Sequence, residues 1–158
     1  MNKKLKTYLI SIGIALAVGG LSAFLTRGSM NLYEEIITPP LSPPSWVFPV
    51  VWTVLFILMG ISAAMIYLDR FSPTPQKKSA LYTYALSLIV NFFWSIIFFN
   101  MRAFLFAFIW LLLLLYLIVR TIMKYYKINT MATYLQIPYL LWVSFAGYLT
   151  FAIWILNK

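Results

Sequence analysis

Long apolar stretches dominate this sequence and decide the solvent in which it folds. Five of them follow one another, at residues 7–26, 47–68, 80–99, 103–123 and 131–156. A helix rises about 1.5 Å per residue, so roughly 20 residues cross the ~30 Å hydrocarbon layer of a bilayer. Each stretch is therefore long enough to span a membrane once. The sequence predicts an all-α membrane protein, with residues 1–158 forming a single five-helix transmembrane domain.

The composition agrees with a membrane environment. Hydrophobic residues make up 63% of the chain and charged residues 9%, and the mean hydropathy is +0.90. The first stretch follows a basic segment, as the core of a secretory signal peptide does. Its uncharged length from Thr7 to Thr26 exceeds the roughly 7–15 residues of such a core. We therefore expect this stretch to remain as the first membrane helix.

The basic residues are concentrated on one side of the predicted bundle. Nine of the 12 lysines and arginines fall at the amino terminus, in the second loop or at the end of the fourth stretch. They are Lys3, Lys4, Lys6, Arg70, Lys77, Lys78, Arg120, Lys124 and Lys127. Because basic residues mark the cytoplasmic ends of membrane helices, we expect a cytoplasmic amino terminus and an outside carboxyl terminus. The membrane is expected to be the cell membrane. The same rule accounts for the net charge of +9 without a nucleic-acid partner.

The first loop, residues 27–45, is the longest connection. It contains two of the three acidic residues and four of the prolines, namely Pro39, Pro40, Pro43 and Pro44. Proline fixes φ and lacks a backbone donor, so the loop is expected to be a stiff extended segment rather than helix. A long ordered loop above the mouth of a bundle is suited to be a lid. A plain connector is the alternative.

The chain lacks the residues of most enzyme sites. It contains no histidine and no cysteine, and its three acids lie in loops or at helix ends. A Ser-His-Asp triad, a zinc site and a buried carboxylate pair are therefore excluded, and no metal site is expected. Proton and ion relays usually need ionisable residues at membrane depth. Many transporters are built from inverted repeats. The sequence shows neither feature, which weighs against a transporter.

Aromatic side chains are abundant instead, with 6 tryptophans, 11 tyrosines and 13 phenylalanines. Many are expected at the membrane interface. Others recur every three or four residues beside polar residues and so share one face of a helix. These stripes are Trp52, Phe56 and Gly60; Ser87, Asn91, Trp94 (or Ser95) and Phe98; and Tyr139, Trp142, Ala146 and Leu149. They predict either tight packing or a flat-walled pocket for a planar apolar ligand.

Three segments resemble the signatures of one membrane protein family. They are Leu41–Thr53 (LSPPSWVFPVVWT) with Leu58–Gly60, Asn91–Ser95 (NFFWS) with Phe98 and Phe99, and Ile137–Trp142 (IPYLLW) with Phe145, Ala146 and Leu149. In this order they are similar to the second, third and fifth helices of the translocator protein family. Its members are also called tryptophan-rich sensory proteins or peripheral benzodiazepine receptors. The resemblance runs along the whole chain.

The resemblance implies a bundle that binds tetrapyrroles such as protoporphyrin IX, and synthetic benzodiazepine-type ligands, in a pocket under the first loop. The porphyrin would be a ligand rather than a cofactor. By position, the implied pocket residues are Ala23, Tyr33, Trp46, Trp52, Phe56, Asn91, Trp94, Tyr139, Trp142 and Ala146. Bacterial members are linked to light-dependent breakdown of protoporphyrin, which implies a photochemical role for Trp52 and Trp142. Whether such a protein counts as an enzyme stays open.

The leading hypothesis is a membrane receptor or sensor for porphyrin-like ligands, ahead of a transporter for them and of a structural scaffold. The resemblance also implies a homodimer. In the first stretch, Ser11, Ala15, Gly19 and Ala23 form a ladder of small side chains that lets another helix approach closely. That helix could belong to the same chain or to a second copy. Membrane lipid is the remaining expected partner.

Overall fold

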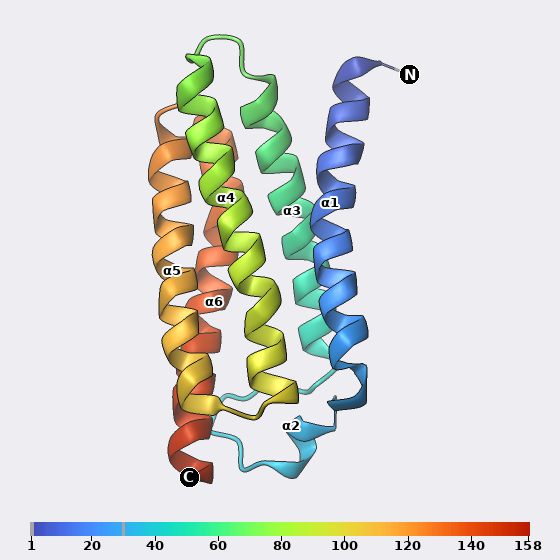
Figure 1. Cartoon of the computed structure of the whole chain (residues 1–158), viewed down its shortest axis with the longest axis vertical. Coiled ribbons are helices and arrows are strands. Elements are labelled where there is room, and N and C mark those ends of the chain that lie inside the picture. The colour runs from blue at the N-terminus through green and yellow to red at the C-terminus, as the bar shows by residue number, and fades with distance from the viewer. Residues whose placement is uncertain (1, 30) are drawn as a thin grey trace.

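The computed structural model describes residues 2–29 and 31–158, without the side chain of Tyr33. Five long helices run side by side (Figure 1). They are α1 (Lys3–Thr26), α3 (Val47–Leu68), α4 (Thr74–Ser95), α5 (Phe104–Tyr126) and α6 (Thr130–Asn157). Each is long and apolar enough to cross a membrane. The structure therefore confirms the predicted all-α, five-helix fold, with α3 to α6 as the second to fifth spans.

The helices close into a ring. Around it the order is α1, α3, α6, α5 and α4, and α4 packs against α1 to complete the circle. Spans that follow one another in the sequence run antiparallel, so the five spans place the two termini at opposite ends of the bundle (Figure 1). Side chains such as Met59, Ile66 and Ile118 are fully buried between the helices.

Local signals fix where the helices begin. The Asn2 side chain accepts a hydrogen bond from the Lys4 N–H at 2.9 Å, and Asn129 caps α6 in the same way through the Ala132 N–H at 3.1 Å. Asparagine is a preferred residue at this position because its side chain satisfies an otherwise unpaired donor. The third span begins at Thr74 rather than at residue 80, because Pro75 lies in the first turn, where its missing N–H costs nothing.

Small residues bring α1 close to α3. A Cβ at Gly60 would lie 2.5 Å from the Cα of Ile12, and one at Gly19 would lie 2.3 Å from the ring of Phe56. The Ser11 hydroxyl donates to the Gly60 carbonyl at 2.7 Å, and Ala15 is fully buried. Three members of the predicted ladder therefore serve packing within the chain.

The first loop is partly helical, which corrects the prediction of an extended segment. Arg27–Ser29 form a 3-10 turn and Leu32–Glu35 form the short helix α2. All four loop prolines lie after residue 38, so no proline restricts φ or removes a donor in the first part of the loop.

The loop crosses the end of the bundle where the C terminus lies, and side chains of the bundle hold it there (Figure 1). Arg102 forms an ion pair with Glu35 at 2.9 Å. The Asn157 side chain accepts from the Ile37 N–H at 2.9 Å and donates to its carbonyl at 2.8 Å. The Tyr148 hydroxyl donates to the Pro40 carbonyl at 2.8 Å. The loop is thus an ordered cover over this end.

The end of α4 widens into a π-helix at Ile96–Asn100. There the Met101 N–H donates to the Ile96 carbonyl at 3.1 Å. Within this segment Phe98 is buried and Phe99 is partly buried. Such π segments are rare and frequently occur at functional sites.

Candidate ligand-binding cavity

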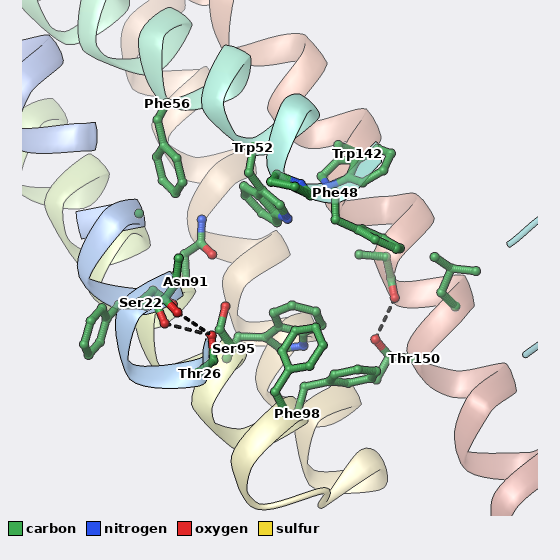
Figure 2. Close-up of a pocket in the computed structure, with 18 of the residues that line it drawn as sticks. Ser22, Thr26, Phe48, Trp52, Phe56, Asn91, Ser95, Phe98, Trp142 and Thr150 are labelled. Carbon is green, nitrogen blue, oxygen red and sulfur yellow. Dashed lines mark hydrogen bonds between the residues drawn. The ribbon is translucent and has the colours of Figure 1, made fainter. Parts of the chain in front are cut away.

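A cavity of about 220 Å³ lies inside the bundle, at the end that the first loop covers. Its walls come from α1, α3, α6, the end of α4 and the π-helix. Figure 2 shows Phe48, Trp52 and Phe56 reaching into it from α3. The opposite side carries Thr26 of α1 and Phe98 of the π-helix (Figure 2). In the described part of the chain, α5 supplies none of the lining residues and packs outside the cavity.

Aromatic rings line the cavity in two mutually supporting groups. In the first, Trp52 stacks on Phe56 with ring centroids 5.6 Å apart, and Phe48 meets Trp142 edge-on at 5.8 Å. In the second, Trp94 stacks on Phe98 at 5.2 Å, and Phe98 meets Phe99 edge-on at 4.9 Å. Such stacked and edge-on pairs are favourable geometries for aromatic side chains. The rings therefore hold one another in place as flat walls.

The polar groups of the lining are few and neutral. They are the side chains of Ser22, Thr26, Ser45, Asn91, Ser95 and Thr150, together with the tryptophan N–H groups. Thr26 donates to the Ser22 carbonyl at 2.9 Å, and Thr150 donates to the Ala146 carbonyl at 2.7 Å (Figure 2). Their hydroxyl hydrogens are thus used by their own helices. No lysine, arginine, aspartate or glutamate is among the described lining residues.

Two buried indole donors lack a hydrogen-bond partner. The Nε1–H groups of Trp94 and Trp142 are buried, and no group in residues 2–29 or 31–158 accepts from them. Leaving a buried donor unpaired costs about 1–3 kcal/mol. Both tryptophans line the cavity, so a ligand acceptor that reached either N–H group would recover that free energy.

The structure brings most of the implied pocket residues together. Seven of them line the cavity, namely Ala23, Trp52, Phe56, Asn91, Trp94, Trp142 and Ala146. Tyr139 lies next to them, with its ring 6.4 Å from that of Trp52 and its hydroxyl accepting from the Asn91 amide at 3.1 Å.

Two of the implied residues are not placed in the cavity. Trp46 is 66% exposed and does not line it. Trp46 precedes the first residue of α3, as its N-cap, whereas Trp52 and Phe56 lie further along the helix on the face that lines the cavity. The side chain of Tyr33 lies outside the described residues.

Residues 11–155 match the TspO/MBR family. The chain belongs to this family. It is 38% identical over 158 residues to the tryptophan-rich protein TspO of Chlorobaculum tepidum, covering 99% of both chains. It is 32% identical to the translocator protein of Bos taurus, over 94% of this chain and 85% of the other. It is 31% identical to the tryptophan-rich sensory protein of Cereibacter sphaeroides, over 79% and 76%.

The family and the fold agree on the class of protein. A TspO/MBR member with five apolar helices is a multi-pass integral membrane protein. The comparisons confirm the resemblance drawn from the three aromatic signatures. Three of the matching relatives are themselves named for tryptophan, and tryptophans occur in all three sequence signatures.

Sequence reasoning missed several cavity-lining residues on α1 of this TspO/MBR protein and some on α6. Ser22 and Thr26 line the cavity and are buried, although their spacing within an apolar helix was a usable signal for an inward face. Thr150 carries the same kind of signal on α6. Phe99 belonged to the third-helix signature, but its place in the wall depends on the π-helical turn, which the helical spacing did not predict.

The cavity ends at a packed core. On the side away from the loop, the bundle interior holds Tyr84, Tyr125, Gln136 and Tyr139, all buried. Ser62 donates to the Ala132 carbonyl at 2.8 Å in the same region. These side chains close the cavity toward the amino-terminal end.

Proposed function

We propose that this TspO/MBR protein is a membrane receptor or sensor that binds a planar, largely apolar ligand of the tetrapyrrole type, such as protoporphyrin IX. The observation that carries this proposal is the cavity itself, with aromatic walls on two sides and two unpaired indole donors. Flat apolar walls favour a flat apolar ligand, and each favourable aromatic pair adds about 0.5–1.5 kcal/mol. The donors of Trp94 and Trp142 favour a ligand that carries hydrogen-bond acceptors. One relative is named a sensory protein, which agrees with this role.

The size of the cavity implies how such a ligand enters. Its volume of about 220 Å³ is below the roughly 300–1,000 Å³ of pockets that enclose a whole drug-sized ligand. We therefore expect a tetrapyrrole to insert one edge and to displace the first loop as it binds. Any anionic substituents would stay at the mouth, because the described lining has no cation to pair with them.

Contact between a bound porphyrin and the tryptophans of the cavity would also permit photochemistry. A photoexcited porphyrin can oxidise an indole that touches it, or be quenched by it, and neither event needs a proton-transfer residue. Trp52 and Trp142 are the residues proposed for this role, with dioxygen as the oxidant in any light-dependent breakdown. Trp142 also carries one of the unpaired N–H groups.

Titration with protoporphyrin IX, followed by quenching of tryptophan fluorescence, tests the proposal. Saturable quenching is expected, and Trp52→Phe and Trp142→Phe are each expected to weaken binding by roughly tenfold, equivalent to ~1.4 kcal/mol of lost contact. Trp154→Phe is the control, because Trp154 does not line the cavity. If both cavity variants fold and bind as the wild type does, the site is assigned wrongly. Absence of saturable binding would favour a scaffold.

Transport of the ligand is the second hypothesis, and the packed core described above argues against a path through the bundle. Reconstituted vesicles loaded with protoporphyrin IX provide the test. We expect no protein-dependent flux across the membrane. Flux that disappears in Trp52→Phe would favour the transporter instead.

A further inference from the structure

We propose that the amino-terminal end of the protein holds a binding site for the headgroup of an anionic phospholipid. The site is a broad hollow, about 1190 Å³ in volume, at the opposite end from the aromatic cavity. Its lining comes from the start of α1, from the end of α3 through the first turns of α4, and from Asn129 before α6. Figure 1 shows the N terminus and the α3–α4 connection at this same end of the bundle.

The lining is strongly basic. Five of its residues are cations, namely Lys3, Lys4, Arg70, Lys77 and Lys78, and one is an acid, Asp69. The Asp69 carboxylate accepts from the Ser72 N–H at 2.9 Å, and the Lys77 ammonium donates to the Asp69 carbonyl at 2.6 Å. Among the described residues, no ion pair involves these five cations. The ion pair between Arg102 and Glu35 lies at the other end of the bundle. With five cations and one acid, the lining of the hollow therefore carries a net charge of +4.

Apolar groups in the same hollow favour a lipid over a free anion. Phe71 is 98% exposed beside Arg70, and Tyr67 is 57% exposed. Met65, Leu68 and Leu81 complete the apolar part of the lining. Exposed aromatic residues next to basic ones are typical of segments that insert into the membrane interface. A free phosphate would use only the cations, whereas a phospholipid would use both parts.

The arrangement goes beyond the general excess of basic residues at cytoplasmic helix ends. Basic pockets between membrane helices bind anionic headgroups because several cations converge on one phosphate. Arg120 and Lys127 belong to the same end but do not line the hollow. They carry the same charge outside the hollow, so they provide a matched control.

The experiment measures lipid retention by native mass spectrometry and lipid-dependent melting in detergent. Wild-type protein is titrated with phosphatidylglycerol and with phosphatidylcholine. We expect at least tenfold tighter binding of the anionic lipid. Arg70→Gln with Lys78→Gln should abolish that preference, while Arg120→Gln with Lys127→Gln, which removes the same charge, should keep it. Melting without added lipid checks that both variants fold.

Three outcomes would overturn the proposal. Equal losses in the two double variants would show that only overall charge matters. No preference for phosphatidylglycerol in the wild type would show that there is no anionic site. Displacement of the lipid by millimolar inorganic phosphate, with no effect of Phe71→Ser, would show a site for a free anion. A loss of lipid retention in Phe71→Ser would support the lipid.

Discussion

At Gly60, the absence of a side chain decides how closely α1 and α3 approach. The atom that a Cβ would meet is a backbone carbon of Ile12, 2.5 Å away, which cannot move aside as a flexible side chain can. The Ser11 hydroxyl bonds to the carbonyl of the same glycine. The contact is therefore fixed from both helices.

We predict that Gly60→Ala destabilises the bundle by about 1–3 kcal/mol, as overpacking of a tight contact does. The melting temperature in detergent measures it. Gly20→Ala is the control, because nothing lies within 4 Å of a Cβ there. Alanine is favoured over glycine inside a helix by roughly 0.5–1 kcal/mol, so the control should be neutral or stabilising. An equal loss of stability in Gly60→Ala and Gly20→Ala would contradict the close approach of α1 and α3 at Gly60.

The buried tyrosines offer a second residue-level comparison. The Tyr125 hydroxyl is buried, and no described group bonds to it. The Tyr139 hydroxyl accepts from Asn91. We expect Tyr125→Phe to be neutral or stabilising, and Tyr139→Phe to cost about 1 kcal/mol or more because the Asn91 amide loses its acceptor. Thermal melting of the two variants checks this. A loss in Tyr125→Phe as large as in Tyr139→Phe would mean that both hydroxyls have partners.

At the scale of elements, the first loop is held by groups at the ends of other helices. Asn157 at the end of α6 pairs with both backbone groups of Ile37. Each net hydrogen bond contributes about 0.5–1.5 kcal/mol, so the Asn157 contacts are the strongest candidates for holding the cover in place. The exposed ion pair of Arg102 and Glu35 is expected to contribute less.

We predict that Asn157→Ala speeds association of protoporphyrin IX by roughly tenfold, because the loop that the ligand displaces is held less tightly. The equilibrium affinity should rise by a similar factor and dissociation should change little, because the bound state has already lost these contacts. Stopped-flow quenching measures the rates. Ser144→Ala is the control, because the Ser144 hydroxyl bonds only to its own helix, at the Leu140 carbonyl. Unchanged rates in Asn157→Ala would mean that opening of the loop does not limit entry.

The transmembrane helices are the part of the structure that the sequence predicted best. The five spans followed from apolar length alone, because a bilayer demands about 20 such residues per crossing. The stripes containing Trp52 and Asn91 predicted much of the wall, because helical spacing fixes which side chains share a face. On α1 the resemblance implied only Ala23. The spacing of Ser22 and Thr26 indicated an inward face, but the helices that pack against that face depend on the order of helices around the ring, which the pattern of one helix does not specify. The π-helical shift at Phe98 and Phe99 has no sequence signature.

At the scale of the whole molecule, charge is divided unequally between the two ends. The amino-terminal end carries nine cations and Asp69, and the other end carries Arg27, Arg102 and Lys158 with Glu34 and Glu35. The net charges are thus +8 and +1, which sum to the +9 of the chain. We propose on this basis that the amino-terminal end faces the cytoplasm.

Reporter fusions at the two termini test this orientation. A reporter that is active only in the cytoplasm should work at the N terminus and fail at the C terminus. The opposite pattern would place the covered end of the bundle inside the cell. Replacing Lys77 and Lys78 with glutamine should reduce the bias, whereas replacing Lys158 should not, because only the first pair belongs to the basic end.

The packed interior beyond Asn91 has a consequence for what the protein can report. A cavity that packed side chains close on one side exchanges ligand with the compartment on its open side, and the compartment behind the packed side chains does not affect its occupancy. Its occupancy would follow the chemical activity of the ligand in one leaflet and the adjoining water. Such a protein could respond to the concentration of the ligand on that side without dissipating a ligand gradient between the two compartments.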